Sequence, residues 1–141
     1  MDPMSIPVLP HLPAAETWRE STYPFASRRN PALRTLDDAL ETYENSFRRY
    51  NGVSQAYYLA LNAASNEPER LTGLEIQSVR EQAEEAFSRA ARDFEAVDIA
   101  FSLWVESGES SSVMPRVREL QKLLSAGRSQ LSAQAAHILV W

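Results

Sequence analysis

Apolar residues recur every three or four positions along most of this chain, and this spacing indicates amphipathic α-helices. Beyond residue 30, the first pattern alternates steps of three and four, the a/d spacing of a heptad repeat, with Ser54 as its polar member. This first stripe reads Leu33, Leu36, Leu40, Tyr43, Phe47, Tyr50, Ser54, Tyr57, Leu61 and Ala64. The spacing continues across Asn51 and Gly52. We therefore predict a single helix over about residues 31–65, capped by Asn30.

Two further stripes of the same kind follow. The second reads Ile76, Val79, Ala83, Phe87, Ala90, Phe94, Val97, Phe101 and Trp104, with a stutter after Ala83. The third reads Val113, Val117, Leu120, Leu124, Gly127, Leu131, Ala135 and Ile138. Breaks near Pro68 and Gly108 separate them, so we predict helices over about residues 68–107 and 112–140. The second helix begins either at Pro68 or after a Thr72 cap.

The first thirty residues have a different composition. Six of the eight prolines occur at or before position 31, and proline fixes φ and lacks a donor N–H. We therefore predict an extended Pro-rich arm over residues 1–30. Apolar residues, which disordered segments usually lack, are spread along it: Ile6, Val8, Leu9, Leu12, Trp18, Tyr23 and Phe25. We expect the arm to be bound, either to its own bundle or to a neighbour.

These patterns predict an all-α fold: an elongated, antiparallel three-helix bundle with coiled-coil-like packing over residues 31–141, preceded by the arm. No run of alternating apolar and polar residues predicts a strand. Small residues are frequent in the second and third predicted helices. We therefore expect those two helices to pack most tightly, and the first, with its tyrosines, to lie further away.

Composition and charge narrow the class of protein. The chain has 141 residues, 44% of them hydrophobic, and a formal net charge of -5, which suits one globular domain and disfavours nucleic-acid binding. Neither a signal peptide nor a transmembrane helix is readable, so we expect no membrane insertion. We expect a soluble protein, cytoplasmic or incorporated in a virion or secretion assembly.

Candidate chemistry is sparse. There is no cysteine, which excludes disulfides and thiol catalysis, and the two histidines, His11 and His137, have no Glu-x-x-His partner for a metal. The glycines are too scattered for a phosphate-binding loop. Glu81, Glu84 and Glu85 are expected on a solvated surface. We predict that the chain is not an enzyme and has no catalytic, cofactor-binding or metal site.

Aromatic residues are the better candidates for function, as contacts with other proteins. Phe47, Tyr50 and Tyr57 lie beside arginines, which can indicate nucleic-acid stacking, but their stripe positions favour packing. Tyr58 is off the stripe and is a candidate exposed contact. Val140 and Trp141 extend past the third stripe, where they either cap the bundle or fill a pocket on a partner. The expected protein-interaction residues are Trp18, Tyr23, Phe25, Tyr43, Tyr50, Tyr57, Tyr58, Val140 and Trp141.

These features favour assembly over catalysis. We expect a non-enzymatic structural or adaptor subunit of a larger protein assembly, of the kind found in phage virions or bacterial secretion apparatus. It would form a homo- or hetero-oligomer through the arm and the helical stripes. The alternative is a small helical chaperone, regulator or immunity-type protein that masks a single protein partner. A catalytic or ligand-binding bundle would need an internal polar cavity, for which the sequence shows no pattern.

Overall fold

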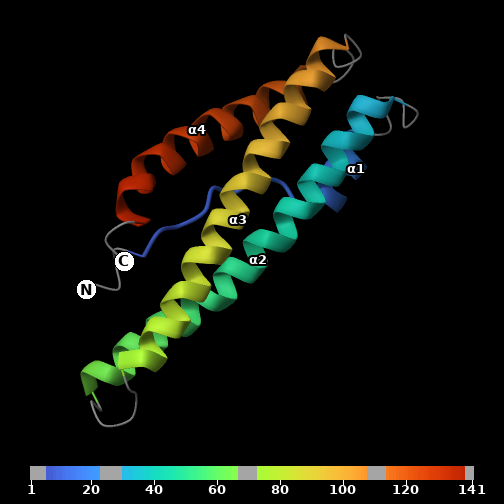
Figure 1. Cartoon of the computed structure of the whole chain (residues 1–141). Helices are drawn as coiled ribbons and strands as arrows, with labels where there is room; N and C mark the ends of the chain where they lie inside the picture. Colours follow the sequence, from blue (N-terminus) through green and yellow to red (C-terminus); the bar gives the residue numbers. More distant parts are fainter. Residues whose placement is uncertain (1–5, 23–29, 67–72, 108–113, 139–141) are drawn as a thin grey trace.

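The computed structural model describes residues 6–22, 30–66, 73–107 and 114–138, and all its regular elements are helices. They are α1 (Ala15–Thr22), α2 (Pro31–Asn66), α3 (Gly73–Glu106) and α4 (Met114–Ile138). Helices α2 and α3 form a long antiparallel hairpin, and α4 descends from the C-terminal end of α3 while diverging from it (Figure 1). The described ranges contain no strand, so the prediction of an all-helical chain is confirmed.

The N-terminal segment differs from the predicted arm. Residues 6–14 lack a regular helix or strand, but Ala15–Thr22 form α1. The described residues therefore contain four helices, and neither an arm extended over residues 1–30 nor a three-helix count is confirmed. The reason is local, because no proline lies between Pro13 and Pro24. The stretch also begins with alanine and has Glu16 in its first turn, where the helix dipole favours an acid.

The boundaries of α2 follow from its capping residues. The Asn30 side chain accepts a hydrogen bond of 2.9 Å from the Ala32 N–H, as expected for an N-cap. Gly52 is accommodated inside α2, which runs unbroken. The competing predictions for the start of the second helix, Pro68 and Thr72, lie outside the described residues. None of the described helices is long and apolar enough to cross a membrane.

The core lies mainly between α2 and α3. Tyr43 packs edge-on against Phe94, and Tyr50 against Phe87, with ring centroids 5.7 and 5.3 Å apart. This pairing continues along most of both helices, whereas α4 touches α3 over a shorter stretch. The prediction that the second and third helices pack most tightly is therefore wrong. Large rings that interlock across α2 and α3 bury more apolar surface than the small residues of α4 could.

Gly127 shows what the small residues of α4 do instead. A Cβ atom on Gly127 would overlap the ring of Phe94 and lie 3.0 Å from Cβ of Pro10. The absence of a side chain at Gly127 thus makes room for the Phe94 ring of α3 and for Pro10. From here on, the arm means the extended segment of residues 6–14, which is the part of the predicted arm that the structure describes outside α1. The arm lies between α2 and α4 and separates them (Figure 1).

Candidate protein-interaction surfaces

The arm is held on its own bundle by hydrogen bonds from α2. Tyr43 and Tyr50 donate from their hydroxyl groups to the carbonyl oxygens of Pro10 and Pro7, respectively. Between these contacts, the Leu9 side chain is buried. Burial raises the pKa of both tyrosines, so their hydroxyl groups stay protonated and remain donors.

Helix α4 binds the opposite edge of the arm through two glutamines. The Gln134 side chain accepts a hydrogen bond from the Val8 N–H (2.6 Å) and donates one to the Val8 carbonyl oxygen (2.9 Å). Gln130 donates a second bond to the same oxygen (2.7 Å). Extended backbone outside a sheet needs such partners for its polar groups. The arm is therefore bound on both edges by helices of its own chain.

Helix α1 is fixed on α3 by a tryptophan and on α2 by an arginine. Trp18 packs edge-on against Trp104, with ring centroids 5.7 Å apart. Nε of Arg19 donates to both carboxylate oxygens of Asp37 (2.9 and 2.8 Å), and Nη2 donates to Glu41 (2.8 Å). These bonds raise the pKa of the Arg19 guanidinium, which stays charged.

Most of the expected interaction residues that the structure describes are interior. Trp18, Tyr43, Tyr50 and Tyr57 are each only 1–2% exposed. The three tyrosines pack within the chain, mainly against α3, and Trp18 packs against Trp104. The expectation that they contact a neighbour stays a prediction. Tyr58, off the stripe, is exposed. The remaining four, Tyr23, Phe25, Val140 and Trp141, lie outside the described residues.

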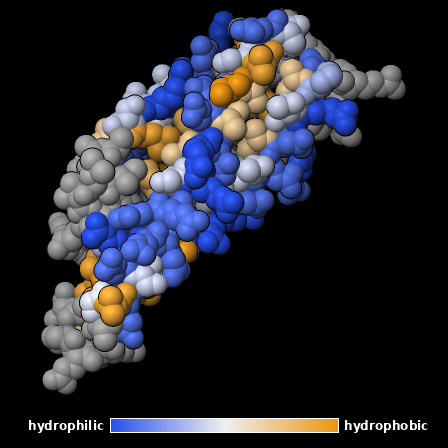
Figure 2. Space-filling model, in the orientation of Figure 1, coloured by the Kyte–Doolittle hydropathy of each residue, from blue (hydrophilic) through white to orange (hydrophobic). Residues whose placement is uncertain are grey.

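The α2–α3 hairpin has an open side that the sequence analysis missed. The arm and α1 pass behind the hairpin in Figure 1, and the described part of the chain leaves its front uncovered. Ile99 and Leu103 of α3 are 56% and 52% exposed, and Ala96, about one helical turn before Ile99, is also exposed. Figure 2 shows hydrophobic side chains gathered over this half of α3. We call these three residues the α3 apolar patch.

A polar groove continues the open side toward the middle of the hairpin. It has a volume of about 400 Å³, is open to solvent, and lies between α2 and α3. It is lined by Thr42, Asn45, Ser46, Arg49, Arg89 and Asp93. The Ser46 hydroxyl donates to the Asp93 carboxylate, which joins the two helices across the groove floor. Arg49 and Arg89 are exposed, and neither forms an ion pair with any described residue.

A signal for part of this surface was present in the sequence. Ile99 and Leu103 are apolar residues four positions apart, yet neither falls on the second stripe. Apolar residues on the face of a helix opposite its core stripe indicate a second contact. The two arginines carried no such signal. They come from different helices, and only the register of the hairpin brings them to one groove.

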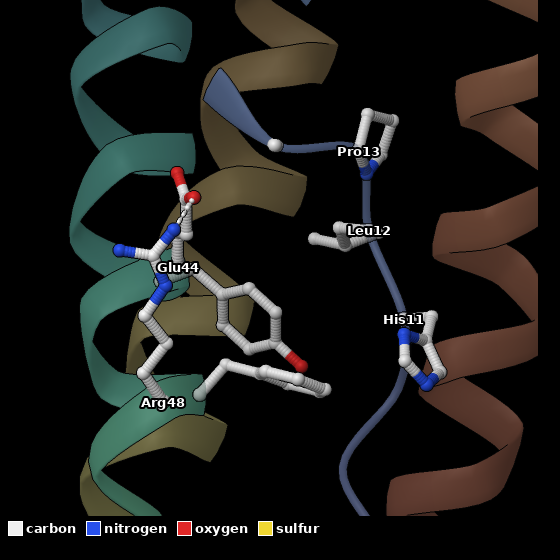
Figure 3. Close-up of a pocket in the computed structure, with 8 residues that line it drawn as sticks. His11, Leu12, Pro13, Glu44 and Arg48 are labelled. Atoms are coloured by element: carbon white, nitrogen blue, oxygen red, sulfur yellow. Dashed lines mark hydrogen bonds and ion pairs between the residues drawn. The ribbon is translucent and has the colours of Figure 1, made fainter. Parts of the chain in front are cut away.

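A smaller cleft lies between the arm and α2 (Figure 3). It has a volume of about 210 Å³, and His11 and Leu12 of the arm face Glu44 and Arg48 of α2 across it. Glu44 accepts the Ala15 N–H (3.2 Å) and pairs with Arg48 (2.7 Å). Ligand pockets usually measure about 300–1,000 Å³. This cleft is smaller, and its carboxylate already binds the first turn of α1.

The distal end of the hairpin is uncharged on α2. From Tyr50 to Asn66 the helix contains no acidic or basic residue, and Tyr58 and Leu59 are exposed there (44% and 55%). This is a second apolar region, further from the arm than the α3 apolar patch.

The described residues show no arrangement suited to a metal. Among them, no group of three or more His, Asp or Glu side chains lies close enough together to hold an ion. Compared with protein-family models, curated proteins and solved structures, the chain matches none of them.

Proposed function

We propose that this chain is a non-enzymatic structural or adaptor subunit of a larger protein assembly, of the type found in phage virions or bacterial secretion apparatus. In this proposal it binds a neighbouring protein through the α3 apolar patch. The supporting observation is that Ile99 and Leu103, adjacent on one face of a long helix, are each more than half exposed. Grouped exposed apolar side chains mark interaction sites on soluble proteins.

The arm has a different role in this proposal. Its buried side chain, Leu9, and its backbone groups at Pro7, Val8 and Pro10 are already bound within the chain. Contact with a neighbour therefore falls to the open side of the hairpin. The arm holds α2 and α4 in place, and the antiparallel helices provide a stiff body.

The size of the patch limits what it can do alone. Burying one Ile or Leu completely contributes about 1.5–3 kcal/mol, so two half-exposed side chains contribute roughly that amount together. Stable protein interfaces bury about 800 Å² on each partner. A partner must therefore extend beyond the α3 apolar patch onto neighbouring surface.

The test is co-purification from the native source with matched variants. Ile99→Glu and Leu103→Glu place a charge on the α3 apolar patch, and Leu74→Glu places one on an exposed apolar residue (79%) elsewhere on α3. We expect the first two variants to lose the assembly and the third to keep it, all with unchanged helicity by circular dichroism.

Retention of the assembly by the Ile99→Glu/Leu103→Glu double variant would contradict the proposal. A strict one-to-one complex, measured by light scattering, would instead favour the chaperone, regulator or immunity-type alternative. Deletion of residues 1–30 is a poorer test, because it also uncovers Tyr43 and Tyr50 and damages the core.

A further inference from the structure

We infer that the open side of the α2–α3 hairpin binds an acidic amphipathic helix of a partner protein. The apolar residues of the partner helix would lie on the α3 apolar patch, and one carboxylate of the partner helix would lie between Arg49 and Arg89. The inference rests on the proposed function, because it specifies the partner of the same surface.

The first step is the placement of the two arginines. Ser46 and Asp93 are hydrogen-bonded across the hairpin and fix its register. Arg49 follows Ser46 by three residues, and Arg89 precedes Asp93 by four. Because α2 and α3 are antiparallel, these two arginines lie at about the same height along the hairpin. Both line the polar groove. A single group entering the groove can therefore reach both guanidinium groups.

The second step is their charge. Other arginines of the chain, such as Arg48, Arg80 and Arg116, pair with carboxylates on their own helices. Arg49 and Arg89 have no such partner among the described residues, and only one carboxylate, Asp93, lines their groove. The groove therefore carries a local excess of positive charge on a chain whose net charge is -5. Guanidinium groups match a carboxylate in both charge and geometry.

The third step connects the groove to the α3 apolar patch. Arg89, Ala96 and Leu103 are separated by seven residues each, so they share one face of α3. At about 1.5 Å per residue, Arg89 lies roughly 15 Å from Ile99 and 21 Å from Leu103 along the helix axis. An α-helix of three to four turns spans about this distance. In the partner helix, the acidic residue that binds the two arginines should therefore lie about 10–14 residues from the apolar residues that contact Ile99 and Leu103.

The occupant is a separate protein and not a second copy. A second copy would have to present a free amphipathic helix, but the apolar stripes of this chain are already packed internally. A partner that presents a free amphipathic helix with acidic residues matches both halves of this surface. Charge complementarity of this kind selects partners and sets their register.

The experiment selects helical peptides from a randomised amphipathic-helix library displayed on phage, with the full chain as bait. Selected peptides are then synthesised, and their Kd is measured by fluorescence anisotropy. We expect an Asp or Glu at a fixed offset from the apolar positions. The Arg49→Ala/Arg89→Ala variant should weaken binding by roughly tenfold or more, and added salt should reduce this difference. Ile99→Glu should abolish binding.

The matched control is Arg118→Ala/Lys122→Ala, which removes two exposed charges from α4. It should leave the Kd unchanged, and all variants should keep the wild-type melting temperature. The inference is overturned if no peptide binds, if the selected peptides lack an acid, or if the arginine variant binds them as wild type does. It is also overturned if light scattering shows a dimer that the arginine variant dissolves. Co-purification that remains sensitive to Ile99→Glu would leave the proposed function standing in each case.

Discussion

The hydroxyl group of Tyr43, on α2, donates a hydrogen bond to the carbonyl oxygen of Pro10, in the arm. Tyr50 does the same for Pro7, two helical turns further along α2. Because the arm has no helix of its own at these positions, these side chains substitute for the backbone partners it lacks. The strength of this attachment is measurable, and so is its dependence on pH.

Replacing Tyr43 or Tyr50 with Phe should destabilise the fold. Each change leaves a buried carbonyl oxygen without its donor, which costs about 1–3 kcal/mol. Urea unfolding followed by circular dichroism measures this change. Tyr58→Phe, at an exposed position, should stay within about 0.5 kcal/mol of wild type. Equal effects at all three positions would refute the role of the hydroxyl groups.

The two tyrosines should also make the fold sensitive to alkali. Burial raises their pKa above the usual value of about 10. Above that pH the unfolded chain releases phenol protons that the folded chain still holds, so stability falls as pH rises; below it, the tyrosines contribute no dependence. The urea midpoint should therefore decline above about pH 10. In the Tyr43→Phe/Tyr50→Phe variant this decline should be shallower. An equally steep decline would show that these two tyrosines do not cause the alkaline loss of stability.

Leu9→Ala should show how much the arm contributes through burial. Its side chain is 1% exposed, and truncating a buried leucine costs about 2–5 kcal/mol. The control is the adjacent residue, since Val8 is 61% exposed and binds α4 through its backbone only. Val8→Ala should change the free energy of unfolding by less than about 0.5 kcal/mol. If Leu9→Ala is equally mild, the arm does not pack on its own bundle in solution.

Two glycines in helices should respond in opposite directions to alanine. Gly52→Ala meets no atom within 4 Å and should stabilise α2 by about 0.5–1 kcal/mol through helix propensity. Gly127→Ala gains the same propensity, but its Cβ would overlap the ring of Phe94. Overpacking of this kind costs about 1–3 kcal/mol, so the net effect should be destabilising. The melting temperatures of both variants, measured by thermal unfolding, test this prediction. A Gly127→Ala protein that is more stable than wild type would contradict the close packing of Gly127 against Phe94.

The helical elements could be predicted because their signal is local. The stripe from Leu33 to Leu61 requires only that residues three or four apart share a face, and α2 follows it. Asn30 was likewise readable as a cap. The segment Ala15–Thr22 was misread because the surrounding prolines outweighed a short helical stretch.

The arrangement of these elements could not be derived in the same way. Stripe spacing says which residues are buried but not by what, and the first stripe is covered partly by the arm. The position of Gly127 against Phe94 depends on where α4 crosses α3. Arg49 and Arg89 meet only through the register of the hairpin. Ile99 and Leu103 were the readable part of the candidate site, as apolar residues outside the second stripe.

The contact between Val8 and Gln134 joins residues 126 positions apart. Contacts of such separation close large loops of chain, whose entropy opposes their formation until other structure has brought the ends together. Residues of α2 and α3 that lie near the connection between the two helices are close in sequence. The α2–α3 hairpin can therefore form before α4 has packed. The arm cannot complete its hydrogen bonds until α4 is in place. Folding should therefore end with capture of the arm, and a chain truncated before Gln130 should keep its hairpin but leave the arm unbound on one edge.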